Sequence, residues 1–211
     1  NPSGVGNRTR GVRMGGSVDP SGGAQNTMDF WTYDSLGNAI DFGDLVAAKR
    51  FAMSANSPTR GMISGGSFTN PTIGDNIIQF ITIASTGNAQ TFGDIGSDNK
   101  GFGGNGACSN ATRALFGGGG PSYKTTVSTV QMATTGNSYD FGDLTVARNY
   151  SGSTASATRA VWGGGYYTSP ASYVNVIDYM SIATGGNAVD FGDRTVAGSY
   201  VSGCSNGHGG L

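Results

Sequence analysis

The chain has 211 residues, of which only 12% are charged, and its formal net charge at pH 7 is -1. This balance offers no basic surface for nucleic acid or for an anionic membrane, and no apolar run approaches the roughly 20 residues of a membrane-spanning helix. Glycine is abundant, with 38 residues, but 10 Phe, 9 Tyr and 2 Trp argue against disorder. The composition therefore predicts a folded chain with many tight turns.

One four-residue phrase returns about every fifty residues, which indicates a single structural unit made four times. Its copies are Asp41-Phe42-Gly43-Asp44, Thr91-Phe92-Gly93-Asp94, Asp140-Phe141-Gly142-Asp143 and Asp190-Phe191-Gly192-Asp193. Because the repeat runs from end to end, we predict one domain over residues 1–211. Its repeats cover approximately 9–58, 59–111, 112–157 and 158–211.

Each repeat has the same order of parts. A Thr-Arg pair precedes a short apolar run, a Gly cluster, a variable loop, a long alternating strand, a Gly-Asn turn and the strand with the Phe-Gly-Asp phrase. The long strand is apolar on both faces: Met28 and Phe30 lie on one face in the first repeat, and Trp31 and Tyr33 on the other. We therefore expect sheet to pack on either side of it, as in radially arranged blades.

A fourth strand follows each repeat, and its last copy, residues 199–206, lies near the C-terminus. We expect this strand to join the three strands that the N-terminal repeat supplies. Such a blade of mixed origin would close a ring of four blades and leave no sheet edge exposed. The predicted fold class is thus an all-β propeller of four four-stranded blades.

The order of strand, Thr-Arg turn, strand ending in Gly-Gly, variable loop, strand with an aromatic residue, turn and strand resembles the kelch repeat of β-propellers. The paired Tyr and Trp of kelch blades are only partly present, and a four-blade ring is small for that family. The wording Thr-Arg, Gly-Gly-Gly, Thr-Gly-Asn-Ala and Asp-Phe-Gly-Asp is similar to repeats in tail and fibre proteins of bacteriophages, especially those of marine hosts.

The second acid of each phrase is expected to be structural. These acids would cap turns or pair with the arginine of each Thr-Arg pair, giving the structural set Arg10, Asp44, Arg60, Asp94, Arg113, Asp143, Arg159 and Asp193. Calcium is the alternative, since it prefers carboxylate oxygens. However, residues three apart on a strand point to opposite faces, and Thr91 replaces one acid. We therefore predict no metal.

No catalytic residue or cofactor is expected. Residues 101–106 have the spacing of a dinucleotide-binding loop, but no helix pattern follows to present its N-terminus to phosphate. His208 is the sole histidine and has no supporting catalytic motif. Cys108 and Cys204 fall in blades expected to lie opposite each other, so two free, buried thiols are predicted.

The loops after the Gly clusters differ in length between repeats, so we expect recognition there. Their candidate binding residues are Asp19, Gln25, Phe68, Asn70, Tyr123, Lys124, Tyr166 and Tyr167. Aromatic rings with short amides suit a sugar face or a protein surface, although loops that merely solvate the fold are the alternative.

The resemblance to phage proteins implies a non-enzymatic tail or fibre component located in the virion. Its expected partners are other virion proteins or a host-surface glycan or protein, and it would be present in multiple copies in the assembly. The alternative is a free, extracellular lectin that binds carbohydrate in the variable loops. A glycan-active enzyme ranks last, because no loop carries an evident pair of acids at a constant position.

Overall fold

The computed structural model describes residues 2–18, 23–66, 74–99, 106–119, 122–168 and 171–205. Its regular elements are all β-strands. Their bounds are β1 Ser3–Gly6, β2 Arg10–Met14, β3 Gln25–Thr32, β4 Ile40–Lys49, β5 Met53–Asn56, β6 Arg60–Ser64, β7 Ile77–Thr82, β8 Gln90–Asp94, β9 Gly106–Ser109, β10 Arg113–Gly117, β11 Thr126–Gln131, β12 Tyr139–Asp143, β13 Gly152–Ala155, β14 Arg159–Gly163, β15 Tyr166–Thr168, β16 Ala171–Tyr173, β17 Val176–Ser181 and β18 Val189–Asp193.

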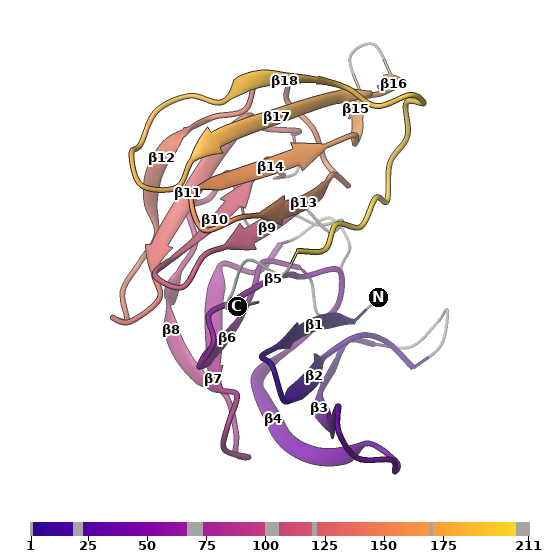
Figure 1. Cartoon of the computed structure of the whole chain (residues 1–211), viewed down its shortest axis with the longest axis vertical. Helices are drawn as coiled ribbons and strands as arrows, with labels where there is room; N and C mark the ends of the chain where they lie inside the picture. Colours follow the sequence, from indigo (N-terminus) through magenta and orange to yellow (C-terminus); the bar gives the residue numbers. More distant parts are fainter. Residues whose placement is uncertain are drawn as a thin grey trace.

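The strands form 4-stranded antiparallel sheets that we call blades one to four. Their strand orders are β1-β2-β3-β4, β5-β6-β7-β8, β9-β10-β11-β12 and β13-β14-β17-β18, and β15 and β16 make a separate hairpin. The blades follow one another along an arc, with β5 lying between β1 and β9, and β9 between β5 and β13 (Figure 1). The all-β, propeller-like fold expected from the repeat is confirmed.

The Phe-Gly-Asp phrase forms a β-bulge in each blade. In blade one Met28 pairs with Gly43 and Asp29 with Asp41, so Phe42 is the extra residue between them. The bulge turns Phe42 into the core, where it is buried and meets the edge of Phe30 at a centroid distance of 5.9 Å. The other blades have the same irregularity at the same place.

Neighbouring blades share cores. One such core combines Val12, Phe30 and Phe42 of blade one with Ile81 and Ile83 of blade two, and equivalent cores join blade two to three and three to four. The long strand of these inner blades is therefore covered on both faces, as its pattern predicted.

At the two ends of the arc that prediction fails. Trp31 and Tyr33, which correspond to Ile81 and Ile83, are 43% and 53% exposed. Phe191 of blade four is likewise exposed. No described residue of another blade covers these two end faces. Their apolar side chains, at positions that are buried in the inner blades, are therefore exposed to solvent.

Blades one, two and three also each bond to the Gly-Asn turn of the following blade. The Gly87 N–H donates to the Phe42 carbonyl at 2.7 Å, and the Ala89 N–H donates to the Asp44 carbonyl at 2.9 Å. The Asp44 N–H in turn donates to Asn88 Oδ1 at 3.0 Å. The same three bonds recur between blades two and three and between blades three and four.

The predicted Arg-Asp pairs are wrong. Arg10, Arg60 and Arg113 donate instead to backbone carbonyls of the following blade. Each guanidinium, and that of Arg159, also lies over an aromatic ring of its own blade. No ion pair among the described residues joins these arginines to Asp44, Asp94, Asp143 or Asp193. The repeated arginine fastens blade to blade through the backbone, which needs no acid.

Among the described residues, two buried ion pairs join successive blades. Lys49 Nζ lies 2.5 Å from Asp75 Oδ2 with both side chains buried, and Arg148 pairs with the fully buried Asp178. Burial lowers the pKa of Lys49, and Asp75 opposes that shift. Asn99 stands at the corresponding place of blade two and donates to backbone carbonyls of blade three.

The predicted closure by the C-terminal strand is also wrong. The inner edge of blade one is already taken by β1, which pairs with β2 through Val5 and Val12. The C-terminal segment, residues 201–205, instead runs beside β13, and Thr154 Oγ1 donates to the Cys204 carbonyl at 2.9 Å. The described blades form an open arc and not a closed ring (Figure 1).

Candidate functional site

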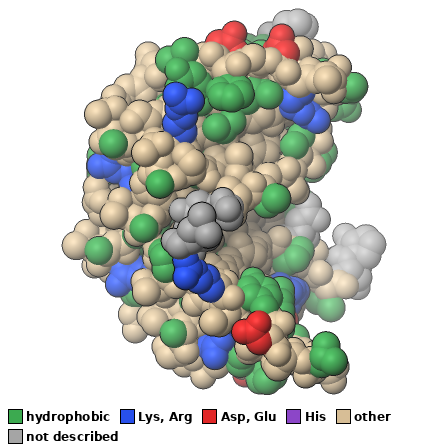
Figure 2. Space-filling model, in the orientation of Figure 1, with side chains coloured by type: hydrophobic (Ala, Val, Ile, Leu, Met, Phe, Trp, Pro, Cys, Tyr) green, Lys and Arg blue, Asp and Glu red, His purple; other side chains and the backbone are tan. Residues whose placement is uncertain are grey.

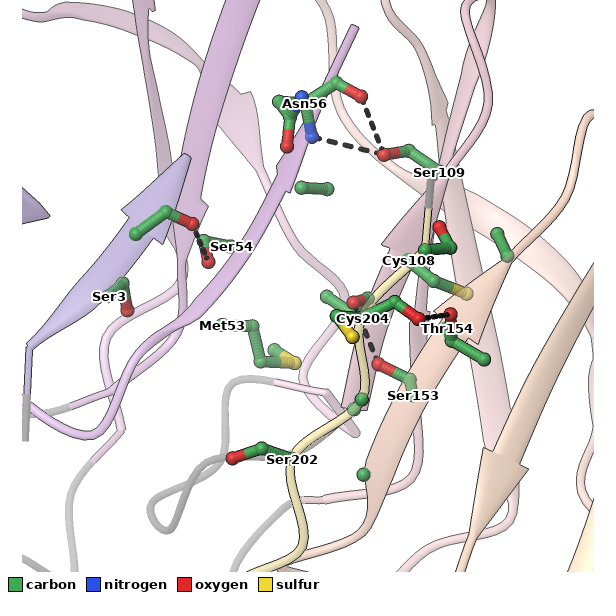
Figure 3. Close-up of a pocket in the computed structure, with 18 of the residues that line it drawn as sticks. Ser3, Met53, Ser54, Asn56, Cys108, Ser109, Ser153, Thr154, Ser202 and Cys204 are labelled. Atoms are coloured by element: carbon green, nitrogen blue, oxygen red, sulfur yellow. Dashed lines mark hydrogen bonds between the residues drawn. The ribbon is translucent and has the colours of Figure 1, made fainter. Parts of the chain in front are cut away.

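A cavity of about 670 Å³ lies where the inner edges of the blades converge. It is lined by β1, β5, β9, β13 and the C-terminal segment, residues 201–205 (Figure 3). Its lining is mostly glycine, alanine and serine, and Arg8 is the charged residue among the described lining residues. The inner strands carry small side chains because four of them and the C-terminal segment approach one another here.

The hydroxyls of this cavity are engaged in joining the strands. Ser54 Oγ donates to the Gly4 carbonyl at 2.9 Å, Ser109 Oγ to Asn56 at 2.8 Å and Ser153 Oγ to Ala107 at 2.7 Å. Figure 3 shows these side chains bridging from one ribbon to the next. They hold the arc together, which leaves the cavity few hydroxyls for a ligand.

The cavity thiols differ from each other. Both cysteines are free, as predicted, but Cys108 is buried and Cys204 is exposed, which corrects the expectation of two buried thiols. Burial raises the pKa of Cys108 to about 12, so its thiol stays protonated and a poor nucleophile. Within the described ranges, no group of three or more His, Cys, Asp or Glu is placed to hold a metal ion.

A second candidate site is formed by tyrosines from separate loops and connectors of blades three and four, whose rings lie close together. We call it the tyrosine cluster: Tyr123, Tyr150, Tyr166, Tyr167, Tyr173 and Tyr200. Tyr123 meets Tyr166 at a centroid distance of 6.0 Å and Tyr167 at 6.5 Å. Tyr166 meets Tyr173 at 5.5 Å, and Tyr150 meets Tyr200 at 4.4 Å. The first three contacts are edge-to-face and the last is tilted, and such contacts stabilise a set of rings in one arrangement.

The backbone fixes this cluster in place. Tyr166 and Asn149 exchange two backbone hydrogen bonds, of 2.8 and 3.0 Å, which tie the hairpin β15–β16 to the connector before β13. The Tyr200 N–H donates to the Tyr150 carbonyl at 2.9 Å. The hairpin lies at the upper right of Figure 1, beside the chain that leads to the C-terminus.

Three of these tyrosines adopt a left-handed backbone conformation, with φ of +52° at Tyr123 and +57° at Tyr150 and Tyr200. Non-glycine residues adopt it at a cost of about 1–3 kcal/mol. Phe51 stands at the same repeat position as Tyr150 and Tyr200 and shares it. The left-handed conformation of Tyr150 and Tyr200 is therefore a feature of the repeated framework, whereas that of Tyr123 is particular to its loop.

Two phenols of the cluster, those of Tyr123 and Tyr150, have raised pKa values. Burial, with Tyr200 nearby, raises the pKa of Tyr150 to about 12. Burial also raises the pKa of Tyr123, and Tyr166 and Tyr200 add to that shift. A neutral phenol both donates and accepts a hydrogen bond, so the cluster combines aromatic faces with polar edges.

The structure brings some of the predicted binding residues together and separates others. Tyr123, Tyr166 and Tyr167 belong to the cluster, and Lys124, next to Tyr123, lies 3.5 Å from Asp98 in an exposed ion pair. Gln25 begins β3 in blade one, where its amide donates to the Gly23 carbonyl. Asp19, Phe68 and Asn70 lie outside the described residues, as does His208.

Sequence reasoning missed Tyr150, Tyr173 and Tyr200. Tyr150 and Tyr200 carry a detectable signal, because both occupy the repeat position of Phe51, directly before an inner strand. Tyr173 lies after the variable loop on β16, and only the pairing of Tyr166 with Tyr173 brings it back to the cluster.

The surface around these sites is weakly charged. Figure 2 shows one face on which Lys and Arg side chains are dispersed and most of the area is uncharged. No helix in the described part of the chain has the length and hydropathy of a membrane span.

Comparison with known proteins gives the fold. No family model matches the chain, and no curated protein matches it. A solved structure titled "Structure of YjhT" is similar with a TM-score of 0.75 and 8% sequence identity, over 95% of this chain and 72% of that one. At this identity the likeness concerns the propeller-like arrangement of sheets alone.

Proposed function

We propose that this chain is a non-catalytic, kelch-like recognition component of a virion tail or fibre, and that its tyrosine cluster contacts a glycan on the host surface. The observation that carries the proposal is the gathering of tyrosines from the loop at Tyr123, the hairpin β15–β16 and two connectors at one rim. The attribution to a virion rests on the resemblance of the repeat wording to phage tail and fibre proteins.

Sugars suit such a surface for a physical reason. The C–H face of a pyranose packs on an aromatic ring, while its hydroxyls bond to polar groups at the ring edges. Neutral phenols provide both kinds of contact, and the low charge of the chain adds no repulsion toward acidic or neutral glycans. A site of this size binds weakly, and multiple copies in a virion would raise the avidity without any new contact.

A glycan array tests the binding part of the proposal, with the full chain as the probe. The variant is Tyr166→Ala combined with Tyr173→Ala, because these rings contact each other and Tyr173 is well exposed. The matched control is Tyr139→Ala, an exposed tyrosine on β12 outside the cluster. We expect the double variant to lose about tenfold or more in affinity, since each ring contributes about 0.5–1.5 kcal/mol. The control should bind as the parent does.

Absence of glycan binding by the parent, or equal binding by both variants, would contradict this assignment of the cluster. Purification of intact particles tests the location. Co-purification with virions supports the tail or fibre component, whereas glycan binding by a protein absent from particles supports the alternative, a free extracellular lectin.

A further inference from the structure

The outer face of blade four has every feature of an interface between blades, yet no described blade covers it. At the bulge position the phenylalanine is 2% exposed in Phe42, 3% in Phe92 and 6% in Phe141, but 57% exposed in Phe191. In blades one to three a following blade lies over this ring. The repeat thus places a core residue in solvent at the end of the arc.

The glycine beside it gives the same indication. A β-carbon on Gly142 would lie 2.2 Å from the Gly186 carbonyl oxygen, because the turn of blade four packs on it. A β-carbon on Gly192, with φ of +134°, would meet nothing within 4 Å. The space that a Gly-Asn turn occupies in the other blades is therefore open at Gly192.

The backbone carbonyls of blade four that would accept hydrogen bonds from a following turn also have no such donors within the described ranges. Gly186 and Ala188 donate to the Phe141 and Asp143 carbonyls across the last described interface. Among the described residues, no corresponding turn bonds to Phe191 and Asp193.

The C-terminal segment, residues 201–205, occupies the place of a fifth inner strand. It runs beside β13 as β13 runs beside β9, and a β-carbon on Gly203 would lie 2.3 Å from the Ser153 carbonyl oxygen. Cys204 stands at the repeat position of Val5, Ala55, Cys108 and Thr154, of which the first three are buried and Thr154 is partly buried. Cys204 itself is exposed. Its segment pairs with no described strand in a sheet of its own, so no further blade covers it.

We propose that the outer face of blade four and the C-terminal segment form a docking surface for the outer strands of a further blade of this same repeat. The C-terminal segment is the inner strand of that blade. The occupant carries a Gly-Asn turn that sits on Gly192 and bonds to Phe191 and Asp193. It also carries an acid or amide opposite Thr195. Thr145 holds the same repeat position in blade three, and its N–H and hydroxyl donate to the carboxylate of Asp178 in blade four.

Blade one shows what such an occupant looks like. Its exposed face presents Trp31 and Tyr33 where the covered blades have buried apolar residues. It also presents the turn Gly37-Asn38, and its Asp29 stands at the repeat position of Asp178. Residues 7–49 therefore provide a test blade of matching chemistry, without their own inner strand β1.

The test extends the full chain. Residues 206–211 are replaced by a second copy of residues 7–49, so that the segment ending at Ser205 runs directly into the appended strands. We expect circular dichroism to show added strand content, and we expect native maleimide labelling of Cys204 to slow by about tenfold or more as the new blade covers it. Cys108 is buried and serves as the internal control.

Two variants separate docking from mere folding of the extension. Phe191→Asp should restore fast labelling of Cys204 in the extended chain while leaving the labelling rate of the unextended chain unchanged. Trp31→Asp within the appended copy should do the same. Unchanged labelling of Cys204 in the extended chain, with or without added strand content, would overturn the proposal. Self-association of the unextended chain that protects Cys204 would make a second copy the occupant and would likewise overturn it.

Discussion

Gly142→Ala probes the contact on which the stacking of blades depends. The new β-carbon would lie 2.2 Å from the Gly186 carbonyl oxygen, and this is backbone that cannot rotate aside. Gly142 has φ of +142°, where a side chain is strained at about 1–3 kcal/mol. The clash also loosens the bonds from Gly186 and Ala188, of 2.9 and 2.7 Å, at about 1 kcal/mol each. We expect the free energy of unfolding to fall by about 3–5 kcal/mol, measured by urea denaturation.

Gly192→Ala is the matched control. Gly192 has a similar φ of +134°, but nothing lies within 4 Å of its added β-carbon. It should therefore lose only the backbone strain, about 1–3 kcal/mol. The difference between the variants, about 2 kcal/mol, measures the contact between blades. Equal losses in the two variants would refute the reasoning, because they would show that the turn of blade four does not bear on Gly142.

Three further predictions concern buried groups. Asp75→Ala strands the buried Lys49 ammonium and should lower the free energy of unfolding by about 3–5 kcal/mol. Trp162 is fully buried and Trp31 is 43% exposed, so Trp31→Phe should leave a blue-shifted emission that acrylamide barely quenches. Burial raises the pKa of Tyr150 to about 12, above the ordinary value of 10.0 for a tyrosine. The folded state therefore holds this proton longer, and stability should fall as pH rises from 10 toward 12. Tyr150→Phe should flatten that fall in a thermal-melting series.

Each of these predictions has an outcome that would contradict it. Asp29→Ala removes a half-exposed ion pair with Arg13 and should cost under about 1 kcal/mol, so an equal loss from Asp75→Ala would argue against burial of that pair. A red-shifted, easily quenched emission from Trp31→Phe would contradict the placement of Trp162. For the titration, an equally steep fall in the parent and in Tyr150→Phe would contradict the assignment of the raised pKa to Tyr150.

The local pattern of the sequence predicts much of the fold. Alternation around Met28 and Phe30 places the long strand, and the Gly-Asn turn ends it. The fourth strand expected after each repeat is the inner strand that begins the next blade. The pairing of Asp44 with Arg10 was not a consequence of any such pattern. It rested on equal numbers of the two residues, whereas the bulge at Phe42 and the turn at Asn88 decide which groups meet.

The closure failed for a related reason. Both β1 and the C-terminal segment have the pattern of an inner strand, and a periodic sequence does not say which of them borders blade one. For the same reason the sequence did not predict that Trp31 and Phe191 are exposed. Their alternation is that of buried residues, and only the position of their blades at the ends of the arc exposes them.

Three members of the tyrosine cluster are among the predicted binding residues. Tyr123, Tyr166 and Tyr167 stand in loops after Gly clusters, where recognition was expected. Tyr150 and Tyr200 stand at a framework position outside the variable loops, where no binding residue was predicted. Their approach to Tyr123 depends on the hydrogen bonds between Asn149 and Tyr166, which a one-dimensional pattern does not contain.

The open arc is the central structural claim, and disulfide trapping tests it most directly. In a Cys204→Ser background, Asn38→Cys with Asp193→Cys pairs the two end faces, and Asp44→Cys with Asn88→Cys pairs a described interface, where the Asp44 N–H lies 3.0 Å from Asn88 Oδ1. Non-reducing electrophoresis after mild oxidation, with mass spectrometry, reads the result. The open arc predicts a disulfide within the chain for Asp44 and Asn88 and none for Asn38 and Asp193. Equally fast formation of both would contradict it and show a closed ring of four blades.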